Sequence, residues 1–105
     1  MAQIPDNIIE IVKKLVKEAD RNNIHITQAI LFGSYAQGKN HEYSDIDVAL
    51  VSEDFEGTRF FDNLKLMKTV LKVNTDIETH PYRPEDFTKD NPLVEEIMRY
   101  GVRIV

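Results

Sequence analysis

The chain has 105 residues, of which 42% are apolar and 30% are charged, and it carries a formal net charge of −5. This length predicts a single domain over residues 1–105. The absence of cysteine excludes disulfides, thiolate metal ligands and a thiol nucleophile. No apolar run approaches the roughly 20 residues that a bilayer requires, and no leader is visible, so we expect a cytoplasmic protein without a membrane segment. Because Lys and Arg gather in no window, we expect no stable nucleic-acid binding.

The first predicted element is an amphipathic helix. Apolar residues recur at spacings of three and four over residues 4–19, and lysines occupy the opposite side. Asp6 or Asn7 is predicted to cap its start. Asn22 and Asn23 are predicted to end it in a left-handed conformation.

Two strands and a loop are predicted next. Alternation over residues 24–32 predicts a strand that ends at Gly33, and residues 34–44 are predicted to form a loop. Residues 45–51 predict a second strand with one apolar face towards the core. Its two faces would carry Ile46, Val48 and Leu50 on the core side, and Asp45, Asp47 and Ala49 on the other.

The second half of the chain predicts two helices and a third strand. Residues 60–71 predict a helix with Thr58 as its cap, and residues 73–80 alternate as a strand. Asn91 and Pro92 begin a last helix that ends at Gly101, before a short edge strand at 102–105. The polar face of the third strand would carry Asn74, Asp76, Glu78 and His80. Strands that alternate with helices predict an α/β or α+β domain in which helices cover a small sheet.

The strongest candidates for chemistry are carboxylates on adjacent strands. Asp45 and Asp47 would point the same way with Cα atoms roughly 6.5–7 Å apart, so their oxygens could converge on one or two cations. Asp76 or Glu78 could supply a third ligand. Mg²⁺ would neutralise such a cluster, because it prefers carboxylate, water and phosphate oxygens.

A small-residue turn precedes this pair of acids. Gly33 and Ser34 follow the first strand, where exposed N–H groups and a hydroxyl suit a phosphate chain. Ten residues separate Ser34 from Asp45. The combined pattern predicts a phosphate-binding turn and metal ligands in one unit.

This pattern resembles the nucleotidyltransferases of the DNA polymerase beta superfamily, and in particular the small minimal nucleotidyltransferases. The resemblance covers essentially the whole chain and implies that family's polymerase beta-like catalytic core, with a small mixed sheet covered by helices. It implies that Asp45 and Asp47 hold two Mg²⁺ ions and that Gly33 and Ser34 bind nucleotide phosphates. It also implies that Asp76 is the third carboxylate and helps to activate the attacking hydroxyl, while Glu78 stays an alternative.

The resemblance further implies a Mg²⁺-dependent transfer of a nucleoside monophosphate, AMP from ATP, to a hydroxyl. Similar small proteins pair with helical HEPN-type proteins in toxin–antitoxin modules, where the antitoxin adenylylates a partner tyrosine. Gln37 stands where the family often has Arg, and Lys39 is the candidate to replace part of that charge at the nucleotide. The rival hypothesis is a nucleotide-binding or protein-binding module that has lost turnover and neutralises a partner by complex formation.

Other interpretations fit the residues less well. Residues 33–40 nearly match the P-loop pattern, but Asn40 stands where a hydroxyl should bind Mg²⁺ and no helix follows. A haloacid-dehalogenase-type phosphatase would need a continuous apolar strand before its first Asp, whereas Tyr43 and Ser44 precede Asp45. The three histidines are not spaced like a zinc site, although His80 shares the predicted face of Asp76.

Overall fold

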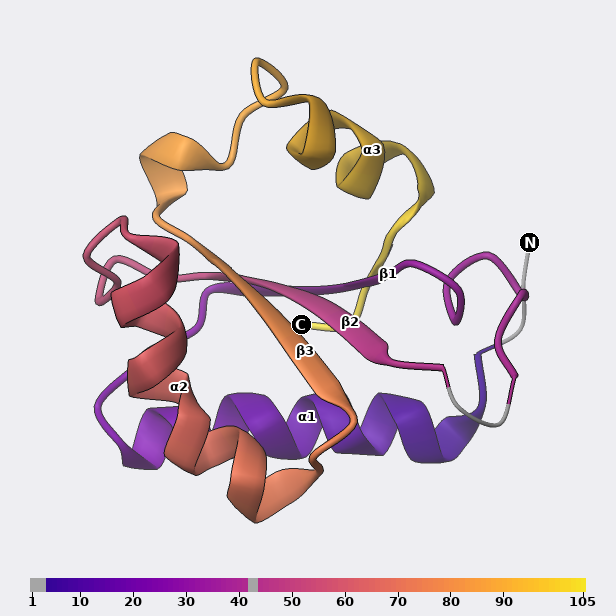
Figure 1. Ribbon diagram of the computed structural model, residues 1–105, viewed down its shortest axis with the longest axis horizontal. Helices are drawn as coiled ribbons and strands as arrows, with labels where there is room; N and C mark the ends of the chain where they lie inside the picture. Colours follow the sequence, from indigo (N-terminus) through magenta and orange to yellow (C-terminus); the bar gives the residue numbers. More distant parts are fainter. Residues whose placement is uncertain (1–3, 42–43) are drawn as a thin grey trace.

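The computed structural model describes residues 4–41 and 44–105 and shows a four-stranded mixed sheet with helices on both sides (Figure 1). The strand order is β3-β2-β1-β4; β1 is antiparallel to β2 and β4, and β2 is parallel to β3. The predicted fold class is therefore confirmed. In chain order the elements are α1 (Asp6–Arg21), β1 (Gln28–Phe32), β2 (Ile46–Val51), α2 (Arg59–Val73), β3 (Ile77–Tyr82), a 3₁₀ turn η1 (Pro84–Asp86), α3 (Pro92–Tyr100) and β4 (Val102–Arg103).

The sheet separates two apolar cores. On one face, Ile46, Val48 and Leu50 pack with the buried sides of α1 and α2. On the other face, Ala49 and Val51 pack with residues of α3. In Figure 1, α1 and α2 lie below the strands and α3 lies above them. The predicted division of β2 into two faces is confirmed, and it turns Asp47 towards the α3 side.

The helix ends follow the sequence in part. Asn23 is left-handed at φ 64°, as predicted. The N–H of Ile24 donates to Ala19 O and that of Asn23 to Asp20 O, which is a Schellman ending. Ile24 therefore completes this helix end instead of beginning β1. The predicted cap at Asp6 or Asn7 is wrong, because Pro5 holds the N-cap position of α1 and no side chain caps it.

The third strand begins later than predicted. Helix α2 continues to Val73, and a turn follows in which the N–H of Asp76 donates to the side chain of Asn74 at 2.7 Å. This local hydrogen bond competes with an extended conformation, so β3 starts only at Ile77. Asp76 thus lies in the turn, and Glu78 lies in the strand.

Helix α3 begins and ends as predicted. The Asn91 side chain accepts hydrogen bonds from Leu93 N and Val94 N, with Pro92 in the first turn. Gly101 ends the helix through close packing, since a Cβ there would lie 2.7 Å from Ile30 Cγ2. β4 occupies only Val102–Arg103 of the predicted edge strand.

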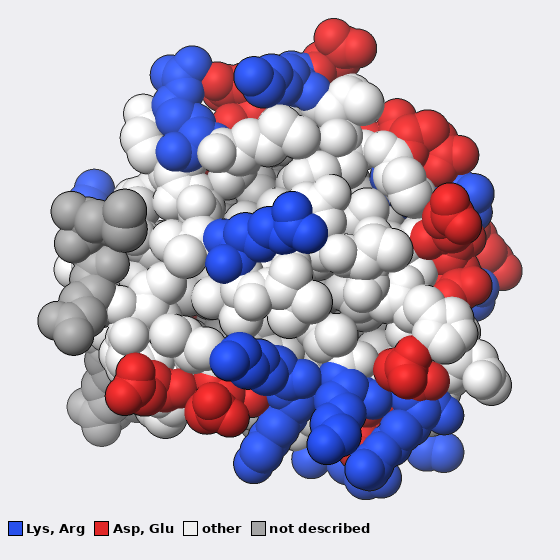
Figure 2. All heavy atoms as spheres, turned by 180° about the vertical axis from the view of Figure 1, so that it is seen from behind, with Lys and Arg blue, Asp and Glu red and all other residues white. Residues whose placement is uncertain are grey.

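Charges of both signs occupy the molecular surface. Figure 2 shows Lys and Arg gathered along the lower edge of one face, where α1 lies, with Asp and Glu at its left and along the right-hand side. No helix in the described ranges has both the length and the apolarity to cross a membrane.

The start of α2 is fixed by a residue one turn inside the helix. Thr58 holds the predicted cap position, but its side chain makes no capping hydrogen bond. The carboxylate of buried Asp62 instead accepts from Glu56 N at 2.7 Å and Gly57 N at 2.9 Å. Asp62 therefore ties the preceding loop to the helix.

We expect Asp62→Ala to lower the free energy of unfolding by about 1–3 kcal/mol, because two backbone donors lose their acceptor. Thr58→Ala is the matched control and should stay within about 0.5 kcal/mol of the wild type. Urea denaturation followed by circular dichroism measures both. An equal loss in the two variants would contradict the assignment of the cap to Asp62.

Candidate active site

The strand register places three polar side chains together on the α3 face of the sheet. Asp47 of β2 is paired with Phe32 of β1 on one side and Glu78 of β3 on the other. Ligand atoms of Asp47, Glu78 and His80 lie within 4.8 Å of one another. This cluster stands where the end of β1 meets the beginnings of β2 and β3.

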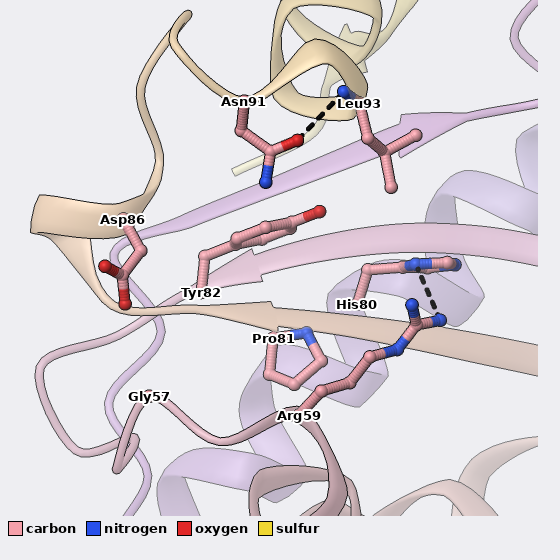
Figure 3. A pocket seen from close by; sticks show the side chains of 8 residues that line it. All are labelled: Gly57, Arg59, His80, Pro81, Tyr82, Asp86, Asn91 and Leu93. Atoms are coloured by element: carbon pink, nitrogen blue, oxygen red, sulfur yellow. Dashed lines mark hydrogen bonds between the residues drawn. The ribbon is translucent and has the colours of Figure 1, made fainter.

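His80 is held in one orientation by its surroundings. Its ring is buried and packs edge-on against Phe32, with ring centroids 4.8 Å apart. Arg59 of α2 donates to Nδ1 at 3.4 Å, the contact drawn as a dashed line in Figure 3. Because a guanidinium can only donate, Nδ1 must accept, and the proton of the neutral ring then lies on Nε2. Nε2 has no hydrogen-bond partner among the described residues and points towards Asp47 Oδ1 at 3.5 Å.

Burial and neighbouring charge act on both titratable groups. Burial, and then the adjacent Glu78 carboxylate, raise the pKa of Asp47, while the neighbouring His80 ring opposes this. Burial, and then the Arg59 charge, lower the pKa of His80. The cluster therefore places two close carboxylates beside a neutral imidazole, and a divalent cation would stabilise the pair of carboxylates.

The turn after β1 approaches this cluster directly. Gly33 has φ +76°, and a Cβ at that position would lie 2.5 Å from Asp47 Oδ2. The turn closes through Gln37 N to Gly33 O at 3.2 Å and Lys39 N to Ser34 O at 2.8 Å. Glycine is favoured here for both reasons, and the backbone at Gly33 lies directly beside the Asp47 carboxylate.

The remaining predicted site residues lie around the cluster. Asp45 and Asp76 are exposed and immediately precede β2 and β3, and the N–H of Ile46 donates to Asp76 O at 2.9 Å. Of the two candidate third acids, Glu78 is the one that the structure brings to Asp47. Lys39 lines a depression with Gln37, Arg99 and Tyr100.

Sequence reasoning missed Arg59 and gave His80 no defined task. Arg59 is far from the acids in the chain, and only the packing of α2 beside β3 brings it to the ring. His80 did carry a signal, since it alternates with Glu78 on the same strand face.

Two hollows flank the cluster. A cavity of about 430 Å³ is lined by Arg59, His80, Tyr82 and Asn91 among others, and Figure 3 shows His80 and Tyr82 pointing from β3 towards the start of α3. A smaller hollow of about 160 Å³ lies between Gly33 and Tyr100. Leu93 borders both. The α3 face can therefore accommodate a ligand larger than an ion.

Comparison with known proteins identifies relatives over nearly the whole chain. Residues 7–104 match the family described as Nucleotidyltransferase domain. Two proteins of Methanocaldococcus jannaschii are similar in sequence: “Putative protein adenylyltransferase MJ1215” is 33% identical over 69% of this chain and 84% of its own length. “Putative protein adenylyltransferase MJ0141” is 28% identical over 92% of this chain and 98% of its own length.

A solved structure shares the fold. The crystal structure described as a toxin–antitoxin with AMP-PNP matches with a TM-score of 0.63 and 23% identity. The match covers 89% of this chain and 71% of the other chain.

We expect Gly33→Ala to cost about 1–2 kcal/mol in stability through its positive φ. It should also weaken Mn²⁺ binding, measured by calorimetry, by about 10- to 100-fold, because the added Cβ displaces the Asp47 carboxylate. Gly57→Ala is the matched control: Gly57 has φ +92°, but its added Cβ would meet Arg83 Cδ at 3.4 Å and Asp86 Oδ2 at 3.6 Å, which are ordinary contacts. Equal Mn²⁺ affinities in the two variants would contradict a cation site at Asp47.

Proposed function

Because the chain belongs to the nucleotidyltransferase domain family, we propose that it catalyses Mg²⁺-dependent transfer of AMP from ATP to a hydroxyl of a partner protein. The observation that carries this proposal is the close approach of the Gly33 backbone to the Asp47 carboxylate. A phosphate bound at the turn would then lie beside the carboxylates that hold the cation. Both named relatives are described as protein adenylyltransferases, which supports AMP as the group transferred and a protein as its acceptor.

The proposed cation ligands are Asp45, Asp47 and one acid from β3 or the turn before it. The oxygen donors fit Mg²⁺, which would neutralise the phosphate charge and the leaving pyrophosphate when bound. Backbone N–H groups at Gly33 and Ser34 would hold the phosphate chain, with Lys39 supplying charge at the open side of the turn.

The reaction forms one bond and breaks one. The acceptor oxygen bonds to the α-phosphorus of ATP while the bond to the bridging oxygen of pyrophosphate breaks. The acceptor proton leaves to a nearby carboxylate, which is Asp76 by family resemblance and Glu78 by its placement next to Asp47. Positioning and charge neutralisation carry most of the catalysis, and no covalent enzyme intermediate is needed.

We propose a helical HEPN-type toxin as the partner and one of its tyrosines as the acceptor. The toxin–antitoxin structure with AMP-PNP supports the coarser part of this proposal, a protein partner and a nucleotide, because one of its chains has the same fold. This chain would then act as the antitoxin.

A second candidate function is neutralisation by complex formation without turnover. Gln37, at a position where the family often has Arg, favours this alternative, because one positive charge near the phosphates would be missing. Asp45→Asn and Asp47→Asn distinguish the two functions: loss of partner neutralisation supports catalysis, whereas unchanged neutralisation supports binding alone.

We expect ATP with Mg²⁺ to raise the thermal stability of the chain, and the other nucleoside triphosphates to do so less. A ligand at about 100 times its dissociation constant stabilises the native state by roughly 2.7 kcal/mol. The shift should require Mg²⁺ and should disappear in Asp47→Asn. Absence of any shift with millimolar triphosphates would argue against a nucleotide site in the isolated chain.

Substitution of Glu78 and of Asp76 in turn shows which of them is the third carboxylate, which would bind the cation and accept the proton. We expect Glu78→Gln to reduce transfer of radiolabelled AMP to a HEPN-type partner by about 100- to 1,000-fold, as for loss of one transition-state stabilising group. Asp76→Asn should change the rate little, because Asp76 lies outside the cluster. The opposite ranking would assign the third carboxylate to Asp76.

A further inference from the structure

Helix α2 carries an exposed apolar stripe. Phe60, Leu64, Met67 and Leu71 follow one another at helical spacings of four, three and four, and Phe61 lies beside them. These five side chains are between 46% and 66% exposed. A continuous apolar stripe of this kind, in a helix whose opposite side already packs on the core, marks an interaction surface.

The exposed charged side chains of α2 itself have one sign. The charged side chains of α2 that reach the surface are all cationic: Arg59, Lys65, Lys68 and Lys72. The single acid of the helix, Asp62, is buried, and its carboxylate accepts hydrogen bonds from the backbone N–H groups of Glu56 and Gly57. Lys65 lies 3.3 Å from the exposed carboxylate of Glu56, a surface pair that contributes little to stability and leaves the ammonium group available to a partner. Lys72 lies 3.4 Å from Glu18, whose side chain is 15% exposed. The net charge of the whole chain is −5, so α2 is locally opposite in sign to the molecule.

A groove connects the stripe to the candidate active site. It has a volume of about 230 Å³ and lies between α2, which supplies Arg59 and Met67, and β3, which supplies Glu78 and Thr79. Thr79 Oγ1 donates to Asn63 Oδ1 at 2.7 Å, which holds the two walls together. Met67 of the stripe and Glu78 of the acidic cluster therefore line the same groove.

We propose that α2 binds the acceptor protein. The part of the acceptor that it binds is an amphipathic helix with an apolar face and acidic flanks. This inference rests on the proposed function for the identity of the occupant, because the groove places anything bound on α2 next to Glu78. A second copy of this chain fits less well, since two α2 faces would bring cations against cations. The apolar stripe supplies the contact area and the lysines select an acidic partner.

Two fluorescein-labelled peptides of roughly 20 residues, long enough to form a helix on the surface, test this proposal. Both carry leucines at helical spacing and one central tyrosine; one has glutamates on its flanks and the other has lysines. We expect the glutamate peptide to bind the wild-type chain in fluorescence anisotropy and the lysine peptide not to bind. The double variant Met67→Gln with Leu71→Gln should bind the glutamate peptide with an affinity that is lower by about tenfold or more. Lys68→Glu should lower the affinity for the glutamate peptide and raise the affinity for the lysine peptide.

Met98→Gln is the matched control, because Met98 is an exposed apolar residue on α3, away from the stripe. It should bind the glutamate peptide like the wild type. The proposal is overturned if neither peptide binds, if both bind equally, or if Met98→Gln weakens binding as much as the double variant. It is also overturned if sedimentation velocity shows a dimer that Met67→Gln with Leu71→Gln dissociates, because the occupant is then a second copy.

The stabilisation by ATP and Mg²⁺ separates this inference from the proposed function. All the α2 variants should keep it, because none of the three substituted side chains belongs to the acidic cluster. Retained stabilisation without peptide binding overturns the docking surface alone. Peptide binding in a chain that ATP does not stabilise overturns the proposed function alone.

Discussion

Each side chain of the candidate site takes its direction from the burial of Ile46, Val48 and Leu50 beneath α1 and α2. A slip of one residue in β2 would carry Asp47 into that core and expose its apolar neighbours, so the core fixes the register. The same register sets Phe32 and Glu78 on either side of Asp47. Gly33 follows Phe32 at once, and its missing Cβ leaves the space that the Asp47 carboxylate occupies. The acidic cluster and the turn beside it are thus consequences of core packing, and a variant that loosened β2 would disturb both together.

The contacts of Arg59 and His80 show why the buried imidazole lies in the acidic cluster without being a ligand for a cation there. A histidine that holds a cation through Nε2 needs a lone pair on that atom and a proton on Nδ1. Here the guanidinium of Arg59 faces Nδ1 and can only donate, which leaves the proton on Nε2 and directs it to Asp47. The ring therefore presents an N–H group, and not a lone pair, to the Asp47 carboxylate. Arg59 also lines the groove beside α2. The same side chain therefore contacts whatever binds in that groove and fixes the His80 ring that faces Asp47.

The sequence predicted those features that depend on local pattern. Alternation in β2 assigned the correct faces, and Asn91 before Pro92 gave the start of α3. The features that it did not predict depend on contacts between distant segments or on competing local bonds. The alternation at residues 73–80 could not reveal that α2 extends to Val73 and that Asn74 forms a turn, so Asp76 was placed on a strand. The choice of Glu78 as the neighbour of Asp47 needs the parallel register of β2 and β3, which no single segment encodes. Arg59 had no local signal at all.

The order of the three strands gives the site a direction that suits the proposed transfer. In-line displacement requires the attacking oxygen and the leaving pyrophosphate to lie on opposite sides of the phosphorus. The turn at Gly33 follows β1, Asp47 lies on β2, and Glu78 lies on β3 at the edge of the sheet. If the turn held the phosphate chain, pyrophosphate would leave on the β1 side. A hydroxyl that arrived over the β3 edge would attack the α-phosphorus from the opposite side. The groove beside α2 borders that same edge, and the smaller hollow, between Gly33 and Tyr100, borders the turn. In the proposed reaction, nucleotide and acceptor would therefore have separate approaches, and they would meet at the Asp47 carboxylate between them.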